Sequence, residues 1–273
     1  MPPPTAPTAV TIAGAAGRMG TRLVALVKEA PDLRLAAALE APRHPSVGRD
    51  AGEVAGVGAA GVLITDDVAA AVGGDRILVE FSAPDPSLEH LRTVAAAGGR
   101  AVIGTTGFSP GQREEIAALA ARASILLAPN MSVGVTLAFK LLAIMATALG
   151  DDYDVEITEV HHRFKKDAPS GTAVRMAEVL AEALGRDLAQ CAVYGRQGLP
   201  GERTTTEIGI LSLRSGDVVG EHTVSFGALG ERLELTHRAQ SRDTFVRGAL
   251  RAVRWIAGRP HGLYSMHDVL GIA

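Results

Sequence analysis

The sequence has a single cysteine and a small net charge, and each of these features excludes a class of protein. The single cysteine, Cys191, excludes an intramolecular disulfide and fits a structural thiol in a reducing, cytoplasmic setting. A formal net charge of -3 at pH 7 gives no general attraction to nucleic acid or to an anionic membrane, so local cations would have to bind an anionic ligand. We therefore expect a small molecule as partner, with no nucleic acid and no membrane.

A long uninterrupted hydrophobic run is also lacking. The most apolar long stretch, residues 133–149, contains Lys140 and is shorter than the roughly 20 residues of a spanning helix, so we predict a buried helix there. Residues 1–7 carry neither the basic nor the apolar region of a signal peptide and are expected to be a short disordered lead-in. We expect a soluble, cytoplasmic protein.

The length and the order of the elements predict two domains. The chain has 273 residues, 47% of them hydrophobic, which is enough to fill two cores. Strands and helices alternate over residues 1–130, which predicts an α/β fold with a Rossmann-like, doubly wound parallel sheet. Over residues 131–240 the order changes to a helix, a strand, a helix and a run of strands, which predicts an α+β domain with a mixed or antiparallel sheet.

The first βαβ unit carries the pattern of a dinucleotide site. A β-branched strand at residues 10–13 runs into a glycine-rich turn, a helix reaches Glu29, and an apolar strand at 33–39 ends in Glu40. Glycines permit a tight turn and close backbone approach, the helix N-terminus binds a pyrophosphate, and the acid accepts hydrogen bonds from a ribose. The alternative is a purely structural turn, because the glycine spacing is G-x-x-G-x-x-G. The predicted cofactor residues here are Gly14, Ala15, Ala16, Gly17, Arg18, Met19 and Glu40.

The residue after Glu40 bears on which dinucleotide is bound. Glu40 favours an unphosphorylated 2'-hydroxyl, and Ala41 follows it in place of a basic residue. The sequence therefore leans towards NADH. Arg18, Arg43 and His44 leave NADPH open.

The remaining strands of this domain end in loops that should meet at one edge of the sheet. Strands are predicted at 62–65, 76–81, 101–104 and 125–128, with helices at 66–69 and 87–97 and another capped by Ser109, whereas 41–61 is predicted to be a loop. The loops at 14–20, 104–107 and 128–131 all follow strands. In a parallel sheet ligands bind outside the carboxyl ends of the strands, so these loops should converge.

The second domain contains the segment richest in reactive side chains. A strand at 154–160 leads into His161 and His162, then into three cations, and Ser170 caps a helix that runs to Leu184. Strands follow at 204–213, 218–226 and 232–237, and a last helix begins near Ser241. Cations beside a helix N-terminus suit a carboxylate ligand.

Two questions about this segment stay open on the residues alone. A nicotinamide delivers hydride, so a nearby acid must supply a proton, and the pattern does not choose between Lys165 and Lys166. Zinc is the competing use of His161 and His162, but neighbouring histidines point to opposite faces of a strand and no second ligand pair lies at metal spacing. We expect no metal, and we expect His222 and His237 to be structural.

The segment Glu159-Val-His-His-Arg-Phe-Lys-Lys-Asp-Ala-Pro-Ser-Gly-Thr172 resembles the signature of the 4-hydroxy-tetrahydrodipicolinate reductases, also called dihydrodipicolinate reductases. The resemblance extends over nearly the whole chain after residue 9. It implies NAD(P)H-dependent reduction of 4-hydroxy-tetrahydrodipicolinate to tetrahydrodipicolinate with release of water, in lysine and diaminopimelate synthesis. It also implies a homotetramer formed through residues 131–240, and a nucleotide domain completed by 241–273.

The resemblance assigns roles to individual residues. His161 would be proton donor or acceptor and Lys165 proton donor. The substrate contacts it implies are His162, Gly171, Thr172 and Thr106. The contacts it implies around the nicotinamide half of the cofactor are Gly104, Thr105, Thr106, Ala128, Pro129, Asn130 and Met131. Ala41 departs from the family, because many relatives carry arginine there, and this affects only cofactor preference.

Two other functions remain as alternatives. One is another two-domain reductase of a small amino-acid-derived substrate, such as a homoserine or aspartate dehydrogenase. A thiohemiacetal step would need a well-placed cysteine, and Cys191 lies outside every motif loop. The other is a non-catalytic nucleotide-sensing regulator on the same fold.

Overall fold

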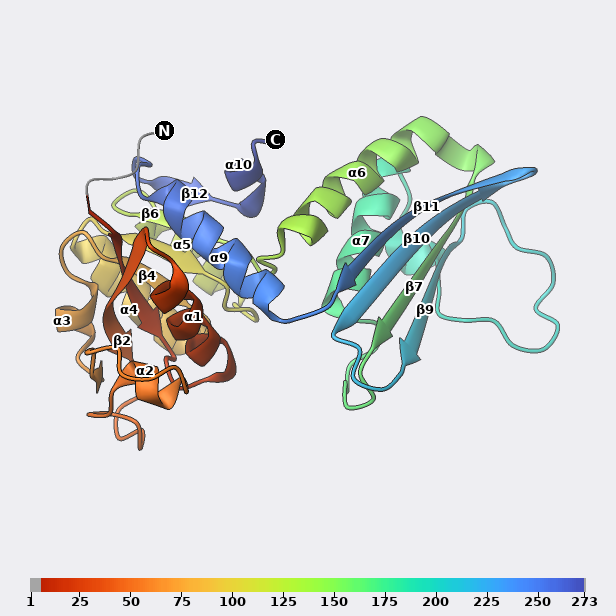
Figure 1. The fold of residues 1–273 in the computed structure, drawn as a ribbon. Helices are drawn as coiled ribbons and strands as arrows, with labels where there is room; N and C mark the ends of the chain where they lie inside the picture. The colour runs from red at the N-terminus through yellow and green to blue at the C-terminus, as the bar shows by residue number, and fades with distance from the viewer. Residues whose placement is uncertain (1–5, 273) are drawn as a thin grey trace. The chain divides into compact units, whose positions relative to one another are not determined.

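The computed structural model describes residues 6–272, and these form two compact units. The first contains the described chain up to Met131 together with Phe245–Gly271, and the second contains Ser132–Thr244. The second unit is thus inserted between two segments of the first. In Figure 1 helix α9 (Asp243–Ile256), strand β12 (Gly262–Tyr264) and helix α10 (Met266–Leu270) accordingly lie among the N-terminal elements of the first unit. The predicted lead-in at residues 1–7 falls largely outside the described residues.

The first unit is built on a seven-stranded sheet in which every pairing is parallel. Its order is β12-β6-β5-β4-β1-β2-β3, so the chain winds to one side of β1 and then to the other. The predicted doubly wound parallel sheet is confirmed. The strands are β1 (Thr8–Ala13), β2 (Leu33–Leu39), β3 (Ile64–Thr65), β4 (Ile77–Glu80), β5 (Arg100–Ile103), β6 (Ser124–Leu127) and β12 (Gly262–Tyr264).

The helices of this unit cover the sheet, whose central strands are buried on both faces. Several predicted bounds needed correction; the helix predicted at 66–69, for example, is found at Val68–Val72. The helix predicted at 87–97 begins at Pro84, because proline lacks only an N-H that the first turn leaves unbonded. The predicted loop 41–61 contains a short helix capped by Asp50. The helices are α1 (Arg18–Glu29), α2 (Ala51–Val54), α3 (Val68–Val72), α4 (Pro84–Ala96), α5 (Pro110–Leu119), α9 (Asp243–Ile256) and α10 (Met266–Leu270).

The C-terminal segment is an integral part of this unit's core. Helix α9 buries a continuous apolar stripe, and a Cβ added at Gly248 would lie 1.7 Å from the carbonyl oxygen of Met131. Strand β12 pairs with β6 at the sheet edge, and the hydroxyl of Ser124 donates to the carbonyl oxygens of Arg259 at 3.0 Å and Pro260 at 2.8 Å. The sheet is therefore complete only when the end of the chain is in place.

The second unit has a five-stranded mixed sheet in the order β11-β10-β7-β9-β8. Strand β7 lies at its centre, parallel to β9 and antiparallel to β10, so the predicted mixed sheet is confirmed. The turn at residues 215–217 joins β9 to β10, although these two strands are not neighbours. The elements are β7 (Asp154–His161), β8 (Ala192–Val193), β9 (Ile208–Arg214), β10 (Gly220–Ala228), β11 (Glu231–Ala239), α6 (Val133–Leu149), η1 (Gly150–Asp152), α7 (Gly171–Ala183) and α8 (Leu188–Cys191).

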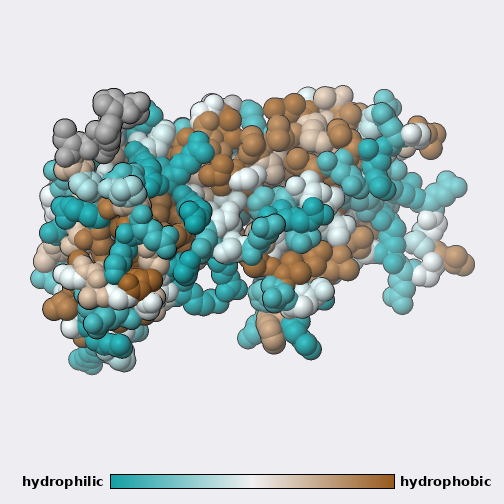
Figure 2. Space-filling view, in the orientation of Figure 1, coloured by the Kyte–Doolittle hydropathy of each residue, from teal (hydrophilic) through white to brown (hydrophobic). Residues whose placement is uncertain are grey.

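Helix α6 corrects the prediction of a buried helix at 133–149. With η1 it forms a 20-residue segment that is long and apolar enough to cross a membrane, yet only 28% of its most apolar stretch is buried. One side packs with α7 on the sheet, and Leu137, Leu141 and Ile144 on the other are 42%, 37% and 54% exposed. Figure 2 shows hydrophobic residues gathered over α6. The sequence is apolar around most of the helix, so its periodicity does not reveal the exposed face.

Candidate active site

The glycine-rich turn of the first unit has the geometry of a phosphate cradle. Gly14 has a φ of +65°, and the N-H of Gly17 donates to the carbonyl oxygen of Gly14 at 2.9 Å. Gly17 is also the N-cap of α1 and supplies no side-chain cap, so the first N-H groups of the helix are left for a ligand. Ala15 is buried below the turn and Arg18 is exposed beside it.

Gly20 explains why the turn needs its third glycine. A Cβ at this position would lie 2.0 Å from the carbonyl oxygen of Gly14 and 2.7 Å from the Cα of Ala15. Only hydrogen fits where α1 packs against the turn. Glycine therefore serves the close helix–strand packing that a dinucleotide turn requires.

Glu40 lies directly beside this turn. Its Oε1 accepts from the N-H of Ala16 at 2.8 Å, and its Oε2 accepts from the N-H of Ala41 at 3.2 Å. The structure thus brings the predicted acid at the end of β2 to the loop after β1. The glycine cradle, the N-terminus of α1 and this carboxylate together fit a dinucleotide.

The other two predicted cofactor loops follow β5 and β6, which are neighbours in the parallel sheet. A cavity of about 140 Å³ lies at this edge, and its lining includes Thr105, Thr106 and Pro129. Thr105 is buried and its hydroxyl bonds to that of Ser87 at 2.8 Å. Ala128 and Met131 are buried as well, so of these residues Thr106 and Pro129 are the better placed to present side chains to a ligand.

The second unit has a polar end on the helix-covered face of its sheet. Residues that pair across neighbouring strands form rows on this face. The rows at one end are apolar: Ile157 on β7 pairs with Ile210 on β9 and with Val224 on β10. Two residues further along the strands the composition changes. The next row contains Ser212, Glu159, His222 and His237, and the row after it contains Arg214, His161 and Gly220. His161 therefore lies among polar groups contributed by four strands.

Glu159 is the centre of this polar end. Its fully buried carboxylate accepts from His161 Nδ1 at 2.6 Å and from the backbone N-H of Ser170 at 3.1 Å. Arg214 donates to both of its oxygens, at 2.9 and 3.0 Å. Burial alone would raise the pKa of Glu159, but the hydrogen bonds from Arg214 and His161 outweigh burial and hold it below the usual value. The group is therefore an ionised acceptor at neutral pH.

The N-terminus of α7 joins the same cluster. Ser170 is its N-cap, accepting from the N-H of Ala173 at 3.2 Å, and its hydroxyl bonds to His222 Nε2 at 2.9 Å. Gly171 and Thr172 form the first turn of this helix. The predicted substrate residues 171 and 172 thus follow directly on the cap that contacts Glu159.

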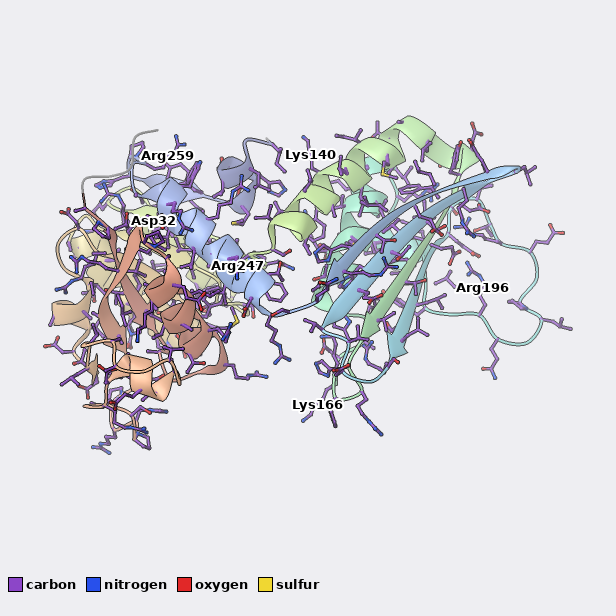
Figure 3. All side chains as sticks on the ribbon, in the orientation of Figure 1. Asp32, Lys140, Lys166, Arg196, Arg247 and Arg259 are labelled. Carbon is purple, nitrogen blue, oxygen red and sulfur yellow. The ribbon has the colours of Figure 1, made fainter. Side chains whose placement is uncertain are left out.

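Lys165 and His162 lie in the loop after β7. The ammonium of Lys165 bonds to both carboxylate oxygens of Asp167, at 2.9 and 2.8 Å, and the side chain is only 19% exposed. His162 is half-buried, with its ring near that of Phe164 and its Nδ1 unpaired within the described chain. Figure 3 places Lys166 at the tip of this loop, where it is exposed. Over residues 6–272, no three His, Cys, Asp or Glu side chains are grouped as metal ligands.

Two models of one protein family together match nearly the whole chain. Residues 8–131 match the model described as the N-terminus of dihydrodipicolinate reductase, and residues 134–270 match its C-terminus. The chain belongs to the dihydrodipicolinate reductase family.

Individual relatives of this reductase agree with the family models. The chain is 54% identical to the 4-hydroxy-tetrahydrodipicolinate reductase of Citrifermentans bemidjiense over 96% of its own length and 98% of the relative's. It is 53% identical to the enzyme of the same name from Geobacter sulfurreducens, over 97% and 99% of the two chains.

Solved structures extend the comparison to the fold. A dipicolinate-bound dihydrodipicolinate reductase from Paenisporosarcina sp. TG-14 is 25% identical, with a TM-score of 0.76 over 96% of this chain and 98% of that one. An amine dehydrogenase from Mycobacterium smegmatis, 18% identical with a TM-score of 0.63 over 94% of each chain, shares the fold.

Three polar residues around His161 belong to the candidate site but not to the predicted set. Arg214 received no role, Ser170 was recognised only as a cap, and His222 was expected to be structural, whereas the first two contact Glu159 and the third contacts Ser170. One signal was present in the sequence. Val155, Ile157 and Glu159 alternate along the strand and point to the same, buried face. The pattern therefore predicts that the carboxylate of Glu159 is buried and needs hydrogen-bond partners.

His222 should make the stability of the reductase depend on pH. Burial, assisted by the nearby His161, lowers the pKa of His222 from 6.5 to about 4. Between these values the unfolded chain binds a proton that the folded chain does not. The free energy of unfolding should therefore be largest above pH 6.5 and fall by roughly 3 kcal/mol on acidification to pH 4.

Urea unfolding at several pH values between 7 and 4, followed by circular dichroism, measures this effect. His222→Asn should flatten the decline over this window, whereas His261→Asn at an exposed site should not. Equal declines in the wild type and in His222→Asn would show that folding does not lower the pKa of His222.

Proposed function

We propose that this chain reduces 4-hydroxy-tetrahydrodipicolinate to tetrahydrodipicolinate, consuming one NAD(P)H and one proton and releasing NAD(P)+ and water, in lysine and diaminopimelate synthesis. The observation that carries the proposal is the Glu159–His161 pair beside the N-terminus of α7. It lies in a chain that matches named reductases over 98% or more of their length. The Paenisporosarcina relative binds dipicolinate, a planar dicarboxylate, which supports a dicarboxylate ligand here.

The residues of the second unit would bind the substrate and move its proton. The ammonium of Lys165 is the proton donor, and His161 is the second acid–base group. His162 and the first turn of α7, Gly171 and Thr172, bind a substrate carboxylate, because helix N-terminal N-H groups and imidazole are donors to anions. Thr106 of the first unit is the remaining substrate contact.

The residues of the first unit would hold the cofactor, which supplies the hydride. The glycine turn and α1 bind the pyrophosphate, Glu40 binds the adenosine ribose, and the loops after β5 and β6 bind the nicotinamide half. These loops contribute Gly104, Thr105, Thr106, Ala128, Pro129, Asn130 and Met131. In this proposal, residues 1–130 together with 241–273 bind the cofactor. Residues 131–240 bind the substrate and form the oligomer.

The preferred cofactor in this proposal is NADH. Glu40 would repel a 2'-phosphate, and Ala41 offers it no cation. Ala41→Arg is expected to raise the NADPH to NADH ratio of kcat/KM by about tenfold, because a charge-assisted hydrogen bond contributes roughly 1.5–3 kcal/mol. Initial rates with each cofactor measure the ratio. Ala41→Gln should leave it unchanged, and an unaltered ratio in Ala41→Arg would show that residue 41 does not reach the ribose.

Self-association through the open face of the second sheet completes the proposal, as a cytoplasmic homotetramer. Leu211 and Leu213, 39% and 49% exposed, lie there on β9 beside Thr158 and Val160 of β7. Burial of this apolar strip would stabilise an assembly. Leu213→Glu should convert the tetramer to smaller species in light scattering, whereas Leu263→Glu, 47% exposed on β12, should not. A monomeric wild type would refute the assembly.

The reaction is tested by oxidation of NADH, with NADPH in parallel, on substrate generated in place from pyruvate and aspartate semialdehyde by the preceding synthase. We expect turnover with both cofactors, faster with NADH. Folded protein that binds NADH but turns over neither cofactor would overturn the substrate assignment in favour of another reductase or a regulator.

A further inference from the structure

Glu159 stands out among the buried groups because its carboxylate is surrounded by donors alone. It accepts from His161 Nδ1, from the two guanidinium nitrogens of Arg214 and from the N-H of Ser170. An ionised carboxylate can only accept, so each of these partners must present a hydrogen to it. The contact at 2.6 Å therefore assigns the hydrogen on Nδ1 of His161.

We propose that Glu159 and Arg214 are positioning residues that fix His161 in the Nδ1-H form, so that Nε2 is the nitrogen that exchanges a proton with the substrate. The proposal rests on the proposed function, because it takes His161 as a group in contact with substrate. Which ring nitrogen of a histidine is free is set by the hydrogen bond that the other one makes.

Arg214 links the Glu159–His161 pair to the loop that contains Lys165. Besides its two bonds to Glu159, its guanidinium donates to the backbone carbonyl of Asp167 at 2.7 Å. Asp167 in turn holds the ammonium of Lys165. One cation on β9 thus orients both the carboxylate behind His161 and the loop of the proposed proton donor.

Gly220 leaves space beside Nε2 of His161. A Cβ added to Gly220 on β10 would lie 2.9 Å from His161 Nε2, closer than side chains tolerate. The imidazole is therefore held at Nδ1 and bordered at Nε2 by a residue without a side chain. The ionisable groups around it are Glu159 on its own strand, Arg214 on β9, and His222 on β10, whose ring centroid is 5.2 Å away.

Glu159→Gln tests the hydrogen bond between Glu159 and His161 with little change in the shape of the side chain. A glutamine can turn its amide nitrogen towards Nδ1 and stabilise the opposite tautomer. We expect kcat/KM to fall about 10²-fold, the lower end of what a positioned acid–base group contributes, with unchanged NADH affinity and an altered pH profile. Glu156→Gln is the matched control, because Glu156 also lies on β7 and is paired with Arg196 and Arg203, but on the opposite face.

Gly220→Ala tests the space at Nε2 and does not disturb a buried charge. We expect kcat/KM to fall at least tenfold, since the methyl group would displace the ring. Gly227→Ala, also on β10, is its control because nothing lies within 4 Å of the added Cβ.

A spectroscopic readout separates this inference from the identity of the substrate. In protein labelled with 15N-histidine, the resonances lost in His161→Gln should show a hydrogen on Nδ1 in the wild type and a changed or mixed tautomer in Glu159→Gln. A wild-type hydrogen on Nε2 in the neutral form, or full activity in both Glu159→Gln and Gly220→Ala, would overturn the proposal. The tautomer is measurable even if the wild type fails to turn over the substrate, so the two failures are distinguishable.

Discussion

Replacing Lys165 with alanine is expected to lower kcat about 10²–10⁴-fold, the usual contribution of a general acid. The side chain is mostly buried, and both carboxylate oxygens of Asp167 hold its ammonium, so the cation has a defined position. Its charge is also among the causes that lower the pKa of His222, after burial and the larger effect of His161, which places it within electrostatic reach of the polar rows. Affinity for NADH should be unchanged, because the proposed cofactor residues lie in the first unit.

Lys166→Ala is the matched control and separates the two lysines that the sequence pattern left equivalent. Lys166 is exposed at the tip of the loop, so its loss should change kcat by less than about twofold. The measurement is steady-state kinetics with NADH at saturating substrate, together with fluorescence titration of NADH. Equal losses in the two variants, or a large loss in Lys166→Ala alone, would reassign the proton donor.

Gly20→Ala is expected to abolish tight dinucleotide binding. The added methyl group would have to occupy space 2.0 Å from the carbonyl oxygen of Gly14 and 2.7 Å from the Cα of Ala15, and both are backbone atoms of the turn. Either α1 or the turn must shift, and the N-H groups of the cradle would move with it. We expect NADH affinity to fall by a factor of about 100, since misplaced contacts commonly cost this much. The free energy of unfolding should fall by about 1–3 kcal/mol, as in other overpacked sites.

Isothermal titration with NADH and urea unfolding measure the two effects. Gly111→Ala is the control, because this glycine lies in the first turn of α5 with nothing within 4 Å of an added Cβ. It should bind NADH like the wild type. Wild-type affinity in folded Gly20→Ala would show that the turn has room to rearrange and that the cradle lies elsewhere.

The first βαβ unit could be predicted closely because its signals are local. The helix ending at Glu29 and the strand at Leu33–Leu39 have the bounds that apolar spacing indicated, and Glu40 lies beside the turn as the fingerprint requires. The caps of α5 and α7 were equally readable, because Ser109 and Ser170 each satisfy an N-H three residues later. Each of these features depends on residues close in sequence.

The polar rows could not be predicted for the opposite reason. Arg214 lies 55 residues from Glu159, and His222 lies 52 residues from Ser170. Their meeting depends on β7 being inserted between β9 and β10, which is a matter of strand order and register. The turn at residues 215–217 gives no hint that a third strand separates the two it joins. The exposed side of α6 was missed because apolar residues occupy both of its faces.

The discontinuity of the first unit sets the order in which the chain can acquire structure during synthesis. Ser132–Thr244 is continuous, so the inserted unit can fold as soon as it leaves the ribosome. The earlier unit emerges first but lacks α9 against Met131 and β12 along β6 until its last residues are made. Up to that point the outer edge of β6 is an unpaired strand, an open template for pairing with another nascent chain. The part that is translated first is therefore completed last.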